Sequence, residues 1–559
     1  MQEIDSTYAQ SASTQPGRVR RRHRLRYVSF ALLALLLLVL LPPLISANRF
    51  QRRIATSISN SLGRPVHLDR VSLNLLPLPG FTLENVVVSE DPAFGTEPII
   101  RANSVRATLR ISSLWSKRVE FSTIRFTEPS VNLVHIANGK WNLESILLQA
   151  SRIEAAPTAQ TKAGPAPRFP YIEATGARLN LKQGQEKLPL SLTDAEFALW
   201  LPKPQEWHLR LQARPTRTDT NISDAGIIQV EGTLGHAASL GQVPLKLEGE
   251  WRNAPLGEAS RLVLGHDAGL RGEMTLTASV GGTVGNSNVQ TRLRLNDTRR
   301  ADFVPARTLS VDLECLGTAT GAFHAFENVR CSWPPAGSGA QTLALAGSLP
   351  DVRKLKSATV EVGTPGIPAS TLLDWLRIAS ARVPADVSAT GTMTGSFSYH
   401  PNGASPWEGE LLIADVSLKS AKAGAASLVA SDIVVRSVPR AMVETSSRRR
   451  TPPSSGSAFV LSPVLLALGG KEPATLEGHL DGSGYTLHLG GMATASRLLA
   501  LGVAVPQFGD SLSEWVPTNR AAGQFRIDLM ASRPWGGPQV WRDAPVHTSA
   551  GRSRRAALR

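Results

Sequence analysis

The sequence predicts a mainly β protein: one N-terminal transmembrane helix, then an elongated antiparallel β-sheet body with a few short helices. Three observations predict this class. An uncharged apolar segment lies near the N-terminus, and apolar and polar residues alternate after residue 65. Gly and Pro are also frequent, with 46 and 38 among 559 residues. Turn residues between short alternating runs indicate strands rather than long helices.

The apolar segment spans residues 27–47 and reads YVSFALLALLLLVLLPPLISA. Its length suits a helix that crosses about 30 Å of hydrocarbon. Six Arg lie between residues 18 and 26, against three between residues 49 and 53. The positive-inside rule therefore predicts a cytoplasmic N-terminus and a body on the far side. A cleaved signal peptide is the alternative, but its apolar core is usually only about 7–15 residues long.

The net charge of +15 resides mostly in the two ends of the chain. Residues 1–53 hold nine Arg against Glu3 and Asp5, and residues 533–559 hold six Arg against Asp543. The remaining body is nearly neutral. Because nucleic-acid binding needs a clustered basic face, the charge distribution argues against nucleic acid as a partner.

A first β module is expected over residues 48–150, after a basic tail at 1–26 and the anchor at 27–47. Residues 49–62 predict a short amphipathic helix with Ile54, Ile58 and Leu62 on one face. Gly63 and Pro65 then end it. Alternating strand patterns follow near residues 66–75, 81–88, 104–111 and 119–126.

An Ala/Pro linker is expected at residues 151–170, then a β-rich body over 171–435. A Ser/Arg/Pro-rich linker at 436–457 precedes a further β-rich segment at 458–531. Residues 532–559 lose the alternation and predict an irregular basic tail, or the truncated or out-of-frame end of a longer body. Residues 369–378 and 493–501 predict the short helices.

One unit recurs in the body: a Gly, a polar residue and then alternating apolar positions, as at residues 272, 391, 409 and 523. Repetition of short strands predicts an extended antiparallel sheet. An apolar sheet face must be buried against something. The sequence leaves two arrangements open, a sheet that curls into a groove and an array of sandwiches.

The two cysteines, Cys315 and Cys331, lie in strand-like segments separated by a Gly-containing turn region. A hairpin would bring their sulfurs within bonding distance, and a compartment beyond the membrane is oxidising. The alternative is a pair of small buried apolar side chains. Two cysteines without a His cluster do not predict a metal site.

No catalytic, cofactor-binding or metal-binding residue is predicted. The sequence has no G-x-S-x-G, no phosphate loop, no H-E-x-x-H and no C-x-x-C. The carboxylate pairs 194/196 and 248/250 each fall on one strand face, which suits solubility rather than opposed acid–base catalysis. Four histidines are expected on polar strand positions: His67, His135, His208 and His488.

Three further residues carry an expectation of their own. Trp141 follows an Asn-Gly turn and is predicted to anchor the core of the first module, with a membrane interface as the alternative. Arg106 and Arg110 are predicted on the strand face opposite the apolar stripe, where solvent rather than lipid phosphate is the expected environment.

An ordered set of segments between residues 48 and 148 resembles the AsmA family of Gram-negative envelope proteins. After the anchor and helix come LGRPV at 62–66, VSLNLLPLPGFTLENVVV at 71–88, EDPAFG at 90–95, RANSVRATL at 101–109, EPSVNLV at 128–134 and NGKWNL at 138–143. The resemblance implies an inner-membrane anchor, a periplasmic β-structured body, and a role in outer-membrane biogenesis and lipid homeostasis. Larger relatives are thought to carry phospholipid in β-grooves.

The expected function is therefore envelope biogenesis, with membrane lipid as the partner, held or transferred in a β-groove. Leaving water gains about 0.8 kcal/mol for each CH₂ of an acyl chain that such a groove would bury. The alternative is a structural factor that assists outer-membrane protein assembly, with assembly components as partners and no lipid transfer. An envelope enzyme is the third hypothesis, which no motif supports.

Overall fold

The computed structural model describes most of the β body and short parts of the N-terminal region. The described residues are 27–30, 32–33, 51–52, 54–56, 58–59, 63–74, 78–110, 121–136, 140–143, 170–203, 206–237, 239–304, 309–337, 339, 342–379, 383, 385–403, 405–420, 428–440, 456–504, 523–534 and 540–543. They form two compact units, one of residues 1–188 with 194–201 and one of residues 189–193 with 202–559.

Strands dominate both units, and the helices are few and short, which confirms the predicted mainly β class. The predicted membrane span at 27–47 falls largely outside the described residues; residues 27–30, 32 and 33 are helical. Among the residues that the structure describes, no helix has both the length and the apolar character needed to cross a bilayer.

The first unit is a mixed sheet. β3 (Gly80–Val88) pairs antiparallel with β1 (Val66–His67), β2 (Arg70–Asn74) and β4 (Ile100–Leu109). β4 then pairs with β5 (Phe121–Thr127) and β6 (Ser130–His135). β7 (Tyr171–Gln183) runs parallel to both β5 and β6. β8 (Glu186–Lys203) contributes to both units.

The parallel pairing of β7 corrects the prediction of a purely antiparallel sheet. A parallel neighbour needs a long crossover rather than a hairpin, and residues 136–170 supply it. The prediction treated this stretch partly as a linker, so the return of the chain to the same sheet was missed. The bend between β5 and β6 lies at Glu128, whose φ is 49°.

The core of the first unit lies between β1–β4 and the short helical stretch before them. Val71 and Ile99 are fully buried there, and Ile54 and Ile58 pack against the cluster. Residues 51–59, where described, are helical. The predicted apolar stripe is therefore confirmed at these two positions, and it covers the β module.

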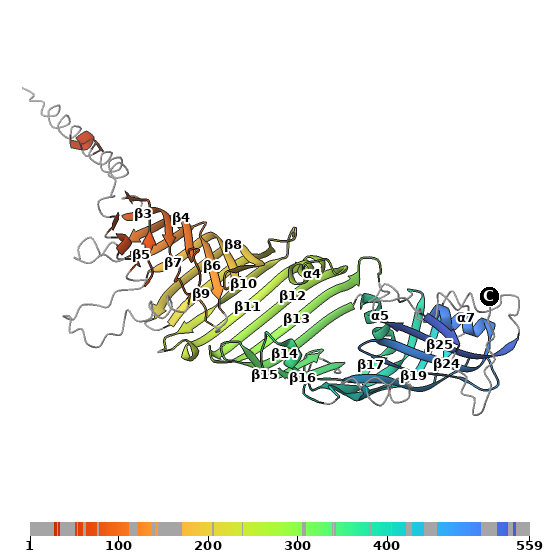
Figure 1. The fold of residues 1–559 in the computed structure, drawn as a ribbon. Coiled ribbons are helices and arrows are strands. Elements are labelled where there is room, and N and C mark those ends of the chain that lie inside the picture. Colours follow the sequence, from red (N-terminus) through yellow and green to blue (C-terminus); the bar gives the residue numbers. More distant parts are fainter. Residues whose placement is uncertain are drawn as a thin grey trace, which may run out of the picture. The chain divides into compact units, whose positions relative to one another are not determined.

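The second unit is an antiparallel meander in which each strand from β9 to β19 pairs with the next (Figure 1). The bounds are β9 (Glu206–Arg217), β10 (Ile227–Gly235), β11 (Pro244–Pro255), β12 (Leu270–Thr283), β13 (Asn286–Arg300), β14 (Leu309–Thr320), β15 (Ala325–Trp333), β16 (Leu343–Leu349), β17 (Thr359–Pro368), β18 (Val387–Tyr399) and β19 (Trp407–Ser420).

β19 pairs with β20 (Leu428–Val429) and β21 (Ile433–Pro439). The meander then continues through β22 (Ser457–Leu466), β23 (Ala474–Asp481), β24 (Gly484–Thr494), β25 (Gln524–Pro534) and β26 (Val540–Asp543). The pairing of β21 with β22 shows that the Ser/Arg/Pro-rich stretch at 436–457 interrupts the sequence pattern and not the sheet.

The C-terminal prediction of an irregular tail from residue 532 is wrong in part. β25 extends to Pro534, and β26 pairs with it between Leu529↔Asp543 and Ser532↔Val540. The physical reason is that the edge of β25 offers free backbone groups. A segment can satisfy these groups by backbone hydrogen bonds without alternating side chains of its own.

In the described part of the second unit, three α-helices lie between paired strands: α4 (Leu256–Leu264), α5 (Ala369–Ala379) and α7 (Ala495–Ala504). α5 and α7 confirm the two predicted helices within a few residues. α4 was not predicted, although its sequence carries the signals. Leu256, Ala259 and Leu262 are buried on one face, and Gly265 ends the helix with φ of 81°.

The recurring Gly of the sequence marks bends in the strands. At Gly391 in β18, φ is 124° and an added Cβ would lie 2.6 Å from the carbonyl oxygen of Ala414. The register of β18 against β19 shifts at this point, and Asp415 opposite has φ of 54°. Only Gly fits a backbone that approaches so closely with positive φ.

Candidate functional site

The most prominent surface of the second unit is one face of β9–β14, here called the apolar face. Opposed residues in an antiparallel register share a face. One row across all six strands is apolar throughout. The row consists of Ala213, Ile228, Trp251, Leu276, Leu293 and Leu313.

Neighbouring rows continue the apolar face. A second row extends beyond β14 into β18, because the registers of β14–β18 carry it onward. It consists of Leu211, Val230, Gly249, Ala278, Thr291, Cys315, Cys331, Leu345, Val362 and Phe397. A third row contains Leu209, Leu247, Val280 and Val289. A fourth row contains Trp207, Leu234 and Leu245.

The apolar face is only partly covered. Leu276, Leu293 and Leu313 are each half-buried rather than buried. The two clusters of fully buried apolar side chains lie elsewhere, one in the first unit and one around α7, and neither includes a residue of β9–β16. Half-exposed apolar side chains in contiguous rows are typical of a surface that binds an apolar partner.

The opposite face of the same strands is polar and contains a hollow of about 750 Å³. Its lining includes Gln, Glu, Arg, Thr and Ser residues and no aromatic residue, and four residues of the second row also border it: Leu211, Val230, Gly249 and Ala278. Glu248 and Glu250, predicted to share one strand face, both line this hollow. The hollow therefore lies mainly among polar residues of β9–β14.

Ion pairs between neighbouring strands organise the polar face. Arg292 donates two hydrogen bonds to Asp312, at 2.7 and 2.6 Å, and Arg294 lies 3.8 Å from the same carboxylate. The hydrogen bonds from Arg292 outweigh partial burial and hold the pKa of Asp312 below its ordinary value. Both guanidinium groups share this carboxylate, so charges on β13 and β14 are paired across the strands.

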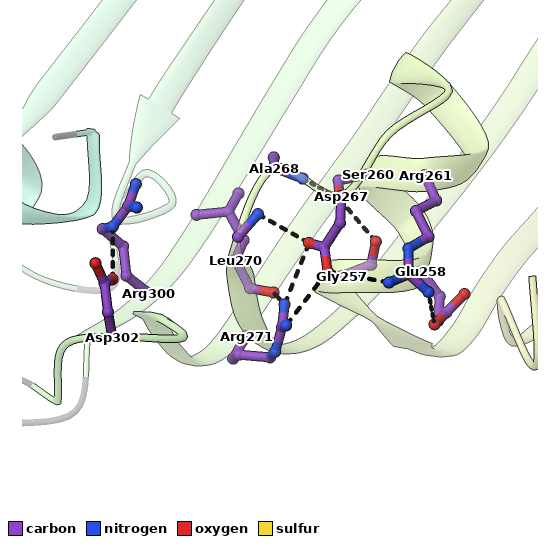
Figure 2. A network of polar contacts seen from close by, with 11 residues as sticks. Gly257, Glu258, Ser260, Arg261, Asp267, Ala268, Leu270, Arg271, Arg300 and Asp302 are labelled. Carbon is purple, nitrogen blue, oxygen red and sulfur yellow. Dashed lines mark hydrogen bonds and ion pairs between the residues drawn. The ribbon is translucent and has the colours of Figure 1, made fainter. Parts of the chain in front are cut away.

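Helix α4 is fixed to its sheet by a network around Asp267 (Figure 2). Arg271 contacts the carboxylate at 3.2 Å with each of two nitrogens, and Arg261 contacts it at 3.3 Å. The backbone N–H of Gly269 donates to Asp267 at 2.8 Å. The hydrogen bonds from Arg271, first, and from Gly269 lower the pKa of Asp267. Val263 and Leu264 at the end of α4 remain exposed.

A buried polar cluster ties the predicted motif segments of the first unit together. Asn142 is fully buried; its Oδ1 accepts from the N–H of Val134, and its Nδ2 donates to Asn132 O. The same Nδ2 donates to Glu90, whose carboxylate lies 3.8 Å from Arg64. This cluster holds the 90–95 segment against the strand at 130–135.

Trp141, predicted as a core anchor, is 42% exposed, and its ring lies 4.8 Å from that of His135. This prediction is wrong: the bridge between Trp141 and His135 turns the Trp outward and places the next residue, Asn142, inside. Arg106 lies between the buried Val105 and Ala107 and so faces away from the core, as predicted.

The structure joins Cys315 and Cys331 in a disulfide, with Sγ atoms 2.07 Å apart. The two residues are directly opposite each other on β14 and β15, and both are half-buried on the apolar face. His488 lies between two carboxylates, 3.1 Å from Glu477 and 2.7 Å from Asp528. Within the described ranges, no cluster of three His, Cys, Asp or Glu side chains suits a metal ion.

Sequence reasoning found the alternating runs but not the rows that they form. Trp251 is the clearest case: it lies in the row that is apolar on all six strands from β9 to β14, and its Nε1 donates to the carbonyl of Ala225 at 2.7 Å. Its position in β11, between alternating Glu and Arg residues, was the available signal. To predict such a row, one must know the register of every strand pair, and a single sequence does not specify it.

Residues 21–188 match the model of the AsmA family, which agrees with the resemblance in the motif segments. No curated protein matches the chain, and no solved structure does.

Proposed function

We propose that the chain, whose residues 21–188 match the model of the AsmA family, acts in envelope biogenesis by binding the acyl chains of membrane lipid on the apolar face of β9–β14. The observation that carries this proposal is the set of half-exposed apolar rows on that face. Transfer of acyl CH₂ groups from water to such a surface is favourable by about 0.8 kcal/mol each.

The proposed location is a Gram-negative inner membrane, with the N-terminus in the cytoplasm and the β body in the periplasm. The supports are the uncharged segment at 27–47 and the larger number of Arg on its N-terminal side. Reporter fusions at residue 20 and residue 203 test this topology. Activity of a periplasm-dependent reporter at residue 20, or its absence at residue 203, would contradict it.

The proposed function assigns no catalytic residue. Lipid binding needs surface and not bond making, so the paired charges of the polar face serve solubility and strand register. We propose that the apolar face forms an open surface along the sheet, over which one lipid can move from row to row.

A photo-crosslinking amino acid placed at residue 276 or at residue 277 tests lipid binding directly. Leu276 and Thr277 are neighbours on β12 that point to opposite faces, so the second position is a matched control. We expect crosslinks to phospholipid from position 276 and few from position 277. Equal capture at both positions would contradict a one-sided lipid surface. Capture of polypeptide at position 276 would instead favour the alternative, a factor for outer-membrane protein assembly.

A further inference from the structure

We propose that the Cys315–Cys331 disulfide is a redox-sensitive link that holds β14 and β15 together at the apolar face. Its reduction would separate the paired edges of these two strands, here called the seam. This inference concerns the regulation of the surface described above, and its functional part rests on the proposed lipid binding. The disulfide lies within a row of that surface, between Thr291 on β13 and Leu345 on β16.

The seam is weak in backbone pairing on both sides of the disulfide. The register of β14 against β15 shifts between Leu316 and Thr318, so the pairing falls into two short runs. The register of β15 against β16 shifts between Phe326 and Val329, and Asn328 has φ of 52°. One of these runs consists of only three paired positions, and the disulfide joins the middle pair.

The disulfide therefore supplies a covalent link where the ladder of hydrogen bonds is short. A link that closes a loop of this size restricts the unfolded or opened hairpin considerably. By contrast, β12 and β13 are paired from Thr283↔Asn286 to Glu273↔Asn296 without a register shift. If the link is cut, the β14–β15 seam is the expected place of opening, and β12–β13 is not.

Both cysteines are half-buried and lie on the apolar face, from which we expect a small dithiol to approach the disulfide. One thiolate of the dithiol attacks the sulfur of one cysteine, which forms a mixed disulfide and releases the other cysteine as a thiolate. The second thiol of the reagent then attacks the reagent's own sulfur in the mixed disulfide and releases the first cysteine. Two electrons and two protons pass to the cysteines, which become thiols, and the dithiol becomes a cyclic disulfide.

The geometry specifies which amides report the opening. The Cα atoms of Cys315 and Cys331 are 4.0 Å apart, as in a non-hydrogen-bonded pair. The flanking pairs are then the hydrogen-bonded ones, so four amides point across the seam: those of Glu314, Leu316, Arg330 and Ser332. The amides of the two cysteines point to β13 and β16 instead.

Hydrogen exchange of the full chain in detergent, resolved by residue, tests the proposal. With dithiothreitol, the four seam amides should exchange roughly tenfold faster or more, while the amides of β12 and β13 keep their rates. The double variant Cys315→Ala, Cys331→Ala should exchange fast without reductant and show no response to it. Unchanged seam amides would overturn the proposal, and so would an equal acceleration throughout the sheet.

Binding of a pyrene-labelled fatty acid, measured before and after reduction, tests the consequence for the surface. We expect reduction to lower the amount of probe bound to wild type, with no effect on the double variant. Equal binding by oxidised and reduced protein, despite an open seam, would overturn the regulatory part. If no probe binds in either state, the lipid function fails, while the exchange rates still decide whether the disulfide fastens the seam.

Discussion

Asn142 donates a hydrogen bond to Glu90 over 52 residues of sequence, with Nδ2 and Oε2 2.5 Å apart. Both groups are buried, so the bond satisfies a carboxylate that water cannot reach. Two motif segments of the family region, EDPAFG and NGKWNL, meet at this contact. The likeness in sequence thus corresponds to a physical junction within the first unit.

Asn142→Ala should lower the free energy of unfolding of the first unit by roughly 2–3 kcal/mol, because it leaves Glu90 and the Val134 N–H without these partners. Asn103→Ala is the matched control, since Asn103 is exposed and its side-chain amide donates to Glu128 at 3.2 Å. We expect a change within about 0.5 kcal/mol there. Urea denaturation measures both, and an equal effect of the two substitutions would refute the structural role of Asn142.

Gly391→Ala should destabilise the second unit by about 2 kcal/mol or more. The new Cβ would meet the carbonyl oxygen of Ala414 at a backbone φ of 124°. At Gly281 in β12 an added Cβ meets nothing within 4 Å. Gly281→Ala is therefore expected to be neutral or slightly stabilising. Thermal unfolding of the two variants, compared with wild type, checks the difference, and similar melting temperatures would argue against a required bend at residue 391.

His488 should make β24 more stable at acid than at alkaline pH. Burial alone would lower its pKa, but hydrogen bonds to Asp528 and Glu477 outweigh it and raise the pKa. A raised pKa means that the contribution is fully present below the unfolded value of about 6.5 and is lost as pH rises through the folded value. The deficit of His488→Gln should therefore be larger at pH 6 than at pH 8.5 in denaturant titrations. A pH-independent deficit would be inconsistent with this charge-dependent contact.

Asp267→Asn should loosen α4 at neutral pH, since the carboxylate holds Arg271 and Arg261 together. Its pKa is lowered, mainly by the hydrogen bond from Arg271, so its contribution is present above the unfolded value near 3.9. That contribution is lost as pH falls through the still lower folded value. Hydrogen exchange of α4 should be faster in the variant at pH 7, and Asp302→Asn, in the separate Arg300 pair, serves as control.

Alternation along the chain predicted the strand-rich segments of the body, though not β26, because the side-chain period of two depends only on local sequence. Residues 274–280 in β12 show this directly: Met274, Leu276 and Val280 lie on the face predicted from the pattern. The helices α5 and α7 were also predictable, since each contains several leucines that do not alternate with polar residues.

Pairing between distant segments was not predictable. The parallel contact of β5 and β6 with β7 depends on a crossover whose length says nothing about its destination. The predicted orientation of Trp141 was wrong for a related reason. Neighbouring residues of an extended segment point to opposite faces, so a shift by one residue exchanges the buried and the exposed side chain. The buried hydrogen bonds of Asn142 favour the arrangement in which Asn142 is buried and Trp141 is exposed.

From β10 to β19, each strand hydrogen-bonds to the one that precedes it in the chain. Contacts of this kind join residues that are close in sequence, so closing each one costs little chain entropy. The second unit can accordingly grow one hairpin at a time in the order of synthesis, with every completed strand serving as the template for its successor.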